Sequence, residues 1–192
     1  MVIALVGRRI DAEDAAEARF PLAMVPFVRE RLRSLFLESG VTTMVSSAAN
    51  GADLIALEEA GHLDIRRVVI LAANRDRFRE GSVSDRPGEW SVLYDRALDE
   101  IDAKGDLHVL GTSLDHSTLF DRDAFAKVNR RILDDAERIS SDANEPLQAV
   151  VVWNGRSRGD GDLTEEFAVE ARRRGIPLLE IDSLGENSQV TE

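Results

Sequence analysis

The chain opens with an uninterrupted apolar run, which is followed at once by a glycine and two arginines: Val2-Ile3-Ala4-Leu5-Val6-Gly7-Arg8-Arg9. A continuous rather than alternating apolar run is typical of a strand that is buried on both faces of a parallel sheet. The run is too short to cross a bilayer and no basic segment precedes it, so it does not resemble a targeting signal. We therefore expect a buried first strand in a cytoplasmic protein.

Runs of the same kind recur along the chain, and segments of helical period separate them. The runs predict strands at 41–46, 67–71, 107–110, 148–153 and 177–181. The periodic segments predict helices after Pro26, over 52–60, over about 90–103, around 125–139 and after Asp162. This alternation predicts a Rossmann-like, doubly wound α/β fold, with a mainly parallel sheet of five to six strands and helices on both faces. We expect the strand order 3-2-1-4-5, with the sixth strand at an edge.

Length and composition bound the fold and the possible partners. The 192 residues, 43% of them hydrophobic, suffice for one domain at 1–182, with an inserted loop at 74–89 and a flexible polar tail at 183–192. The absence of cysteine excludes disulfides and zinc–thiolate sites, and no two of the three histidines have metal-ligand spacing. The net charge of −12 argues against partners such as duplex nucleic acid or an acidic membrane surface.

The segments after strands one, two and five are the candidate binding loops, because doubly wound folds bind ligands beyond the carboxyl ends of their strands. In the first segment Gly7 allows a close backbone approach and Arg8 can grip a phosphate or carboxylate, although a turn glycine beside solvated arginines is the alternative. In the second, Gly51 stands at the entry of a helix, where free amides and the helix dipole favour an anion. Ser47 and Asn50 can add side-chain donors there.

Asp53 follows in the first turn of the same helix. A carboxylate in that turn is favoured by the helix dipole, but it would repel a phosphate placed beside it. We therefore expect Asp53 to orient the loop or to hold a ribose hydroxyl rather than to contact phosphate.

Two segments resemble a known superfamily. The order Ser46-Ser47-x-Ala49-x-Gly51-x-Asp53 is similar to the strand–loop–helix motif of the SLOG superfamily, which contains the DNA-processing protein A family and the LOG, or "lysine decarboxylase-like", phosphoribohydrolases. The stretch Trp153-Asn154-Gly155 and the later Gly159-Asp160-Gly161-Asp162-Leu163-Thr164 are similar to its late glycine-rich loop. The resemblance covers residues 2–181 and implies a domain that binds a nucleotide or a nucleotide-derived ligand. The candidate ligand-binding residues are then Gly7, Arg8, Ser47, Ala48, Asn50, Gly51, Ala52, Asp53, Asn154, Gly155, Gly161 and Thr164.

The late loop departs from the LOG pattern PGGxGTxxE, whose glutamate takes part in hydrolysis. Aligned on Thr164, that glutamate position holds Phe167, and Leu163 replaces the preceding glycine. Glu165 and Glu166 remain as candidate catalytic carboxylates, but out of register, and Asp162 with Glu165 three residues later resembles a capping box. The DNA-processing branch matches mainly the second loop, and this acidic chain does not offer the basic, aromatic groove that single strands need.

Two further connections could border the cleft. Residues 74–90 contain arginines and acidic residues in similar numbers, so this connection could be a lid over the cleft or a solvated insertion. Phe78 and Val83 are the apolar residues expected to attach it to the core. Residues 111–117 follow the fourth strand and hold Asp115 and His116.

Three functions are compatible with these features. The first is a binding module that takes a nucleotide-derived ligand and requires no other cofactor and no metal. The resemblance implies a sensor or regulatory domain in a bacterial stress or conflict system, whose output comes from a homodimer or from an effector-bearing partner protein. The second is a nucleoside-monophosphate N-glycosyl hydrolase that uses Glu165, Glu166 or Asp53. The third is an interaction scaffold without a small ligand.

Overall fold

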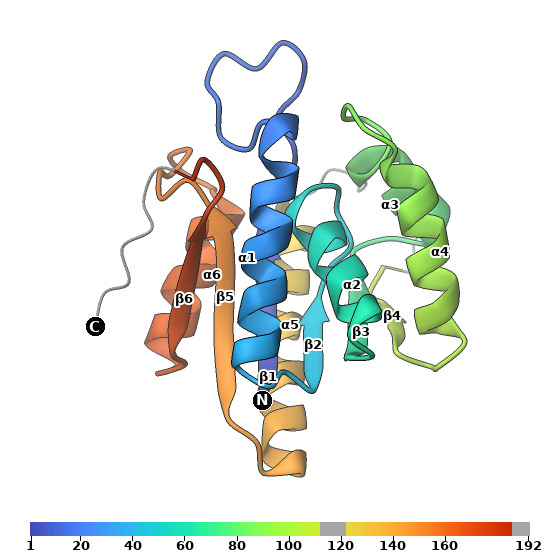
Figure 1. Ribbon diagram of the computed structural model, residues 1–192, viewed down its shortest axis with the longest axis vertical. Coiled ribbons are helices and arrows are strands. Elements are labelled where there is room, and N and C mark those ends of the chain that lie inside the picture. The colour runs from blue at the N-terminus through green and yellow to red at the C-terminus, as the bar shows by residue number, and fades with distance from the viewer. Residues whose placement is uncertain (112–121, 186–192) are drawn as a thin grey trace.

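The computed structural model describes residues 1–111 and 122–185 of the chain. One six-stranded sheet crosses this part of the molecule, and all of its strand pairs are parallel (Figure 1). Its strands are β1 (Val2–Gly7), β2 (Thr43–Ser46), β3 (Arg66–Leu71), β4 (Leu107–Val109), β5 (Leu147–Trp153) and β6 (Leu178–Asp182). The helices are η1 (Leu22–Met24), α1 (Val25–Glu38), α2 (Ala52–His62), α3 (Arg75–Ser82), α4 (Trp90–Asp102), α5 (Arg122–Ala143) and α6 (Leu163–Arg173). The expected Rossmann-like α/β class is confirmed.

The strand order is β4-β3-β2-β1-β5-β6, so the expected place of the fourth strand was wrong. That strand was expected beside β1, but β5 takes this position and pairs with β1 from Val2–Leu147 to Gly7–Val152. The short β4 has no buried residue and lies at the edge beside β3, whereas residues 149–153 of β5 are all buried. A short, half-exposed strand fits an edge and a long apolar one fits the centre. The strand order therefore reverses between β1 and β5.

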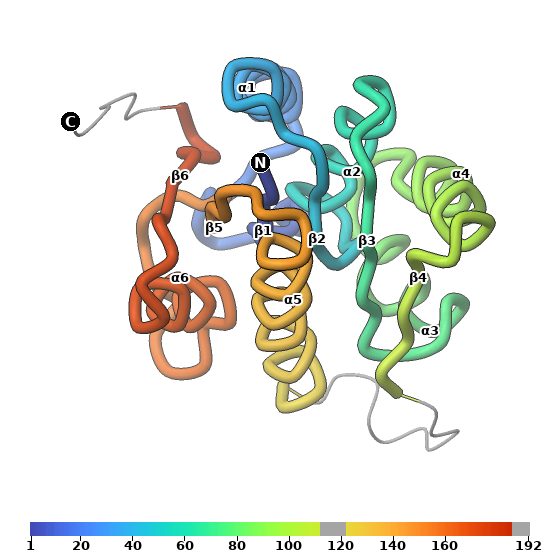
Figure 2. The backbone as a smooth tube through the Cα atoms, turned by 90° about the horizontal axis from the view of Figure 1, so that it is seen from below, coloured from blue at the N-terminus to red at the C-terminus, as the bar shows by residue number. Residues whose placement is uncertain are grey.

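Helices cover both faces of the sheet (Figure 2). One face carries α1, α2 and α4, and the other carries α5 and α6. Because successive side chains of a strand point to opposite faces, β1 places Ile3 and Leu5 in the first core cluster and Val2 and Ala4 in the second. This burial on both sides explains the continuous apolar runs of the sequence.

Helix boundaries follow local signals. α1 carries Pro26 in its first turn, where the missing N–H leaves no hydrogen bond unmade, and the chain leaves the helix at Gly40 with a φ of +58°. α2 continues through Gly61 to His62 and is therefore longer than the expected 52–60.

The connection at 74–89 contains α3, a helix that the sequence analysis did not predict. Asn74 caps it, since its side-chain oxygen accepts a hydrogen bond from the Arg77 N–H at 3.0 Å. Phe78 and Val83 are buried as expected of the two apolar pins. Phe78 is the only large apolar residue of α3, which explains why no helical period was visible.

The expected flexible tail begins at Ser183, near the end of the described residues. Ser183, where the tail was expected to begin, is buried, and its backbone N–H donates to the Trp153 carbonyl at 3.0 Å. Asp115 and His116, like residues 186–192, lie outside the described residues. Within 1–111 and 122–185, no helix has the length and the apolar content to cross a membrane.

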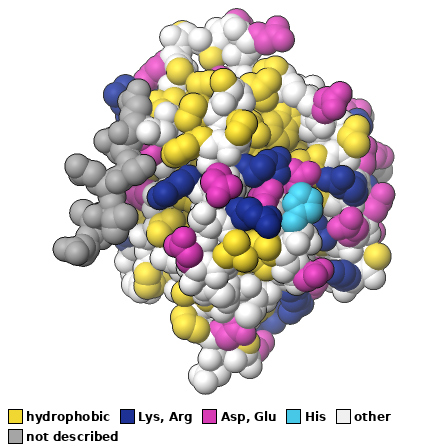
Figure 3. Space-filling model, viewed as in Figure 1, with side chains coloured by type: hydrophobic (Ala, Val, Ile, Leu, Met, Phe, Trp, Pro, Cys, Tyr) yellow, Lys and Arg dark blue, Asp and Glu magenta, His cyan; other side chains and the backbone are white. Residues whose placement is uncertain are grey.

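Charged side chains of both signs alternate over α1 and α2 in Figure 3. Arg29 contacts Glu58 and Glu59 at 2.6 Å each, and Arg96 of α4 contacts Glu58 at 2.8 Å. The excess negative charge is therefore not gathered into a single acidic patch over these helices.

Candidate functional site

A cleft of about 300 Å³ lies at the carboxyl ends of the central strands, beside the point where the strand order reverses. The loops after β1, β2 and β5 all contribute to it, as do α3 and the first turns of α5. These loops meet at the upper end of the sheet in Figure 1. The lining residues are Val6, Gly7, Arg8, Arg9, Ser47, Ala49, Asp53, Phe78, Ser82, Phe125, Val128, Asn129, Arg158, Asp160, Gly161, Asp162, Leu163 and Thr164.

The candidate binding residues divide into two groups. Those that line the cleft are Gly7, Arg8, Ser47, Asp53, Gly161 and Thr164. Those that do not line it are Ala48, Asn50, Gly51, Ala52, Asn154 and Gly155. All three loops thus reach one cleft, but only half of the candidate residues face it.

Gly51 serves the packing of two loops against each other. A Cβ atom at this position would lie 2.7 Å from the Arg8 carbonyl oxygen and 2.9 Å from the Ile10 nitrogen. The residue also has a φ of +89°, which an L side chain rarely adopts. Glycine is therefore required here by the first loop and not by a ligand.

Asn50 holds the same loops together. Its side-chain oxygen accepts a hydrogen bond from the Ile10 N–H at 3.1 Å, and its amide donates to the Ser82 carbonyl at 2.9 Å. The residue is buried, and its hydrogen-bonding groups are engaged by the protein. Asn50 positions the cleft wall, where the sequence analysis expected a ligand donor.

Arg8 forms a buried ion pair that joins the first loop to the third. Its guanidinium donates to the two carboxylate oxygens of Asp162 at 2.7 and 2.6 Å, and it lies 5.6 Å from the centre of the Trp153 ring. Burial alone would raise the pKa of Asp162, but hydrogen bonds from Arg8 and from the Arg158 N–H hold it at about 2. Arg8 therefore supports the cleft, and its charge is neutralised by Asp162 within the protein.

The amides at the helix N-termini are also largely engaged. In α6, Asp162 is the N-cap and accepts from the N–H groups of Thr164 and Glu165, which confirms the expected capping role of this aspartate. In α2, the Ala52 N–H donates to the Arg8 carbonyl at 3.1 Å. These particular helix amides are therefore engaged within the protein rather than free for an anion.

Cationic side chains at the cleft offer a different source of such contacts. Arg158 lines the cleft, and its guanidinium forms no ion pair or hydrogen bond within 1–111 and 122–185. Arg9 also lines it, but pairs with Asp85. Burial lowers the pKa of both guanidinium groups. The ordinary pKa of arginine is so far above 7 that both groups stay charged at neutral pH. Arg158 is therefore the cation available to an anionic ligand.

Two oxygens on the opposite side of the cleft have no hydrogen-bond partner in the described part of the chain. They are the hydroxyl of Ser47 and Oδ1 of Asp53, whose residues are 8% and 6% exposed. Oδ2 of Asp53 accepts from the Ala49 N–H at 3.3 Å. Burial raises the pKa of Asp53 to about 7, although the N–H groups of Ala49 and Gly7 and the charge of Arg9 oppose the shift. The cleft therefore contains a carboxyl group that titrates near neutral pH.

The remaining wall of the cleft is apolar and aromatic. Phe78 of α3 and Phe125 of α5 lie with their ring centres 6.3 Å apart and tilted by 54°, and Val128 follows on α5. Phe78 is held from behind by Tyr94, whose ring stacks with it at 6.3 Å. Such a wall suits a flat, hydrophobic ring.

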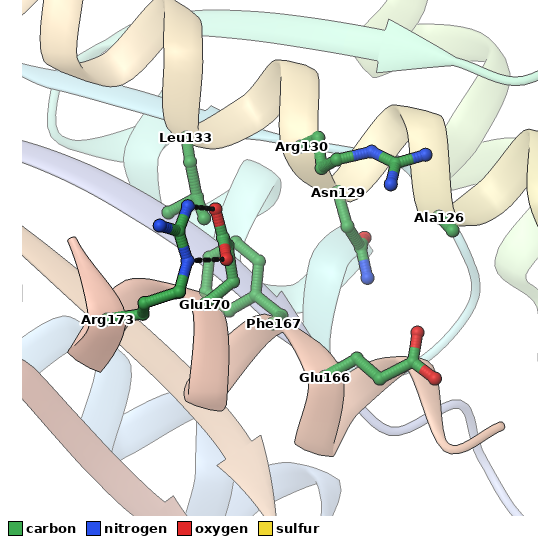
Figure 4. Close-up of a pocket in the computed structure, with 8 residues that line it drawn as sticks. All are labelled: Ala126, Asn129, Arg130, Leu133, Glu166, Phe167, Glu170 and Arg173. Atoms are coloured by element: carbon green, nitrogen blue, oxygen red, sulfur yellow. Dashed lines mark hydrogen bonds and ion pairs between the residues drawn. The ribbon is translucent and has the colours of Figure 1, made fainter. Parts of the chain in front are cut away.

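Glu165 and Glu166, the candidate catalytic carboxylates, do not line the cleft. Glu165 accepts a hydrogen bond from the Ser157 hydroxyl, and Glu166 pairs with Arg122. Glu166 instead borders a second hollow, between α5 and α6, whose apolar side chains are Ala126, Leu133 and Phe167 (Figure 4). The nearby Glu170 and Arg173 neutralise each other through two hydrogen bonds of 2.7 Å.

Several cleft residues were missed by the sequence analysis. Phe125, Val128 and Asn129 come from α5, whereas the predicted binding residues all lie in or beside the loops after strands; Phe78, in the connection that was expected to border the cleft, does line it. The insertion at 74–90 carried a usable signal, because a long connection beside a ligand cleft is often functional. Arg158 lies within the late loop, between Asn154 and Thr164, but nothing in its sequence context distinguishes it from the neighbouring Arg156. Within the described residues, no cluster of three or more His, Asp or Glu side chains could hold a metal.

No protein-family model matches the chain, and no curated protein matches it. Among solved structures, the chain is similar to DNA processing protein A from Streptococcus pneumoniae, with a TM-score of 0.41 and 16% sequence identity. The match covers 98% of this chain and 62% of that chain, so this chain spans less than two thirds of its neighbour's length. Because this TM-score is low, the fold assignment depends on the strand order and the parallel pairing described above.

Proposed function

We propose that this chain is a SLOG-type module that binds a nucleotide-derived ligand in the cleft between the loops after β1, β2 and β5. The observation that carries the proposal is the combination of groups in that cleft. An aromatic wall, an unpaired arginine and two unpartnered oxygens surround about 300 Å³ at the reversal of the strand order. This volume falls at the lower end of the range for small-ligand sites.

Each part of a nucleotide has a matching surface in this proposal. The base packs against the apolar wall through the partly exposed ring of Phe125, with the buried Phe78 and Val128 behind it. The phosphate approaches Arg158, which gains a charge-assisted hydrogen bond that it lacks within the described residues. The phosphate stays away from Asp53, because a carboxylate and a phosphate repel each other.

A module that binds a nucleotide without converting it could report the presence of that nucleotide to another protein. We therefore propose a sensor or regulatory module of a bacterial stress or conflict system, which passes the binding event to a second copy of itself or to an effector-bearing partner. Sedimentation of the chain with and without nucleotide tests the first of these two partners.

A thermal-shift screen with mono-, di- and cyclic nucleotides and ADP-ribose tests the binding. A ligand at one hundred times its Kd should stabilise the fold by about 2.7 kcal/mol. Arg158→Ala should abolish most of the shift produced by a phosphorylated ligand. Arg31→Ala, on the exposed face of α1, removes the same charge away from the cleft and should leave that shift unchanged. If none of these ligands raises the Tm, the proposal is wrong and an interaction scaffold becomes the better description.

A second function, hydrolysis of a nucleoside-monophosphate N-glycosyl bond, is favoured by one observation. Asp53 places a carboxyl group with a pKa of about 7 in the cleft, in the range that suits a general base. In this reaction Asp53 takes a proton from water, the water oxygen bonds to the anomeric carbon, and the C–N bond breaks. The base leaves with the bonding electrons and receives the proton that Asp53 took from water, which regenerates the carboxylate.

Release of free base from nucleoside monophosphates tests this second function. Turnover that disappears in Asp53→Asn but persists in Glu165→Gln and Glu166→Gln would establish it in place of pure binding. Bound nucleotide that is recovered intact after prolonged incubation would rule it out.

A further inference from the structure

We propose that Ser47 and Asp53 form a subsite that hydrogen-bonds to the sugar hydroxyls of the ligand, here called the hydroxyl-reading subsite. The cleft would then bind ribose-containing ligands more tightly than their deoxyribose counterparts. This inference rests on the proposed function, and it assigns the sugar rather than the base or the phosphate. It is carried by two buried oxygen atoms without partners, which belong to two residues that line the cleft.

Two oxygens have no hydrogen-bond partner in the described part of the chain, although the Gly7 N–H lies close enough to the Asp53 carboxyl group to lower its pKa. Oδ1 of Asp53 and the hydroxyl of Ser47 have no hydrogen-bond partner, although their residues are more than nine-tenths buried. The adjacent Ser46 shows the contrast, since its hydroxyl donates to the Ser47 carbonyl at 2.8 Å. A buried polar atom without a partner destabilises the folded state by about 1–3 kcal/mol, so such atoms are few in folded proteins. The others in the described residues are Nε of Arg8 and of Arg9, both at the cleft, and the two side-chain amide atoms of Asn154.

The chemistry of the two groups identifies what they bind. A carboxylate oxygen only accepts hydrogen bonds, whereas a serine hydroxyl both donates and accepts. A ligand hydroxyl can donate to Asp53 and exchange a hydrogen bond with Ser47. Two neighbouring hydroxyls, as on ribose, can serve both side chains at once, and a sugar that lacks one of them leaves a buried oxygen unpaired.

The distribution of charge orients the ligand. Asp53 lies after β2 and Arg158 lies after β5, with β1 between those strands, so the two groups flank the cleft. Neighbouring strands are about 4.8 Å apart, which separates the backbones of the two loops by about 10 Å. The sugar hydroxyls therefore face α2 while the phosphate faces the loop after β5.

Protonation of Asp53 couples this selectivity to pH. The charge that acts on Asp53 is that of Arg9, which itself interacts with Asp85 and Arg86. The other charged residues of the cleft are Arg8, Arg158, Asp160 and Asp162. α3 and α5 contribute the uncharged Ser82 and Asn129. Burial raises the pKa of Asp53 to about 7, so this carboxyl group changes its charge between pH 6 and pH 8.

Deprotonation strengthens the acceptor, because a hydrogen bond to a charged oxygen is about twice as strong as one to a neutral group. Selectivity for ribose should thus rise between pH 6 and pH 8. The phosphate of a nucleotide titrates in the same range, but this effect cancels in the ratio of Kd values for a ribonucleotide and its deoxy counterpart.

The experiment is a calorimetric titration with the four ribonucleoside 5′-monophosphates and their 2′-deoxy and 3′-deoxy counterparts at pH 6.0 and 8.0. At pH 8.0 at least one deoxy series should bind about tenfold more weakly, the effect of one lost hydrogen bond to a charged acceptor. The ratio should fall by up to about tenfold at pH 6.0, and Asp53→Asn should make it independent of pH. Ser47→Ala should lower the ratio, whereas Ser141→Ala, on an exposed position of α5, should not.

Each outcome decides a separate question. Equal binding of ribo- and deoxyribonucleotides by the unaltered protein overturns the hydroxyl-reading subsite but leaves nucleotide binding intact. A ratio that is the same at both pH values removes Asp53 from the subsite, even if Asp53→Asn does not fold. Absence of binding by any of these ligands overturns the proposed function together with this inference.

Discussion

Replacing Asp53 by asparagine should stabilise the protein above neutral pH. Burial raises the pKa of this carboxyl group from its ordinary value of 3.8 to about 7. The folded state therefore holds a proton that the unfolded chain releases near pH 4. Since the folded state binds more protons over this interval, the free energy of unfolding falls as the pH rises from about 4 to about 7.

The size of the effect follows from the same shift. Each pKa unit corresponds to 1.36 kcal/mol, so ionisation of Asp53 costs the folded state about 4 kcal/mol at pH 8. Asparagine avoids this cost, because its oxygen can accept from the Ala49 N–H while its amide takes the place of Oδ1 toward the cleft. At about 2–4 °C per kcal/mol for a domain of this size, even half of that free energy raises the Tm by about 4–8 °C.

Thermal and urea unfolding of both proteins at pH 5.5 and pH 8.0 measure the difference. The advantage of Asp53→Asn should shrink by about 2 kcal/mol at the lower pH, where the wild-type carboxyl group stays protonated. Asp102→Asn, at an exposed position near the end of α4, is the matched control and should change the Tm by no more than about 1 °C at either pH. A variant that is less stable than the wild type at pH 8.0, or an advantage that does not depend on pH, would refute the reasoning.

Three further predictions concern the frame of the cleft. Arg8→Met should destabilise the fold by about 3–5 kcal/mol in urea unfolding, and adding Asp162→Asn should restore part of the loss, because the first change leaves a buried charge unpaired. Gly51→Ala should lose more stability than Gly155→Ala, since both have a positive φ but only Gly51 would clash with backbone; equal losses would contradict the packing role. The stability gap between wild type and Asp162→Asn should narrow as the pH falls from about 4 to 2, where the Asp162 carboxylate becomes protonated and its contribution is lost; a gap that stays constant would show that the carboxylate charge does not matter.

The fold was predictable because its signals are local. Continuous apolar runs and helical stripes identified the strands and most helices, and right-handed crossovers then allow few arrangements of a parallel sheet. The strand order was wrong in one respect that burial explains: the run at 107–110 is short and contains His108, whereas 148–153 is apolar throughout after Gln148. Weighting the strands by length and apolar content would have placed the second run at the centre.

Only half of the candidate binding residues line the cleft, and the reason differs from that for the strand order. Sequence spacing places residues in loops, but it does not say which polar groups the folded protein engages internally. Arg8 and Asn50 have the chemistry of ligand contacts, and both are occupied by partners distant in sequence, Asp162 and Ser82. That Asp53 avoids phosphate stays a prediction, which depends on the helix dipole and on like-charge repulsion and therefore on local position alone.

Asp53 differs from the other buried carboxylates in a way that favours function over stability. The other carboxylate residues buried in the described part of the chain are Glu59, Asp106, Asp135 and Asp162. Each of them forms an ion pair with at least one arginine. Asp53 forms none within those residues, and its unpartnered oxygen belongs to a residue that lines the cleft. A carboxyl group that weakens the fold near neutral pH, and that could be replaced by an isosteric amide, is expected where binding or chemistry needs its charge. If the asparagine variant is more stable and also loses the distinction between ribose and deoxyribose, the same burial accounts for both results.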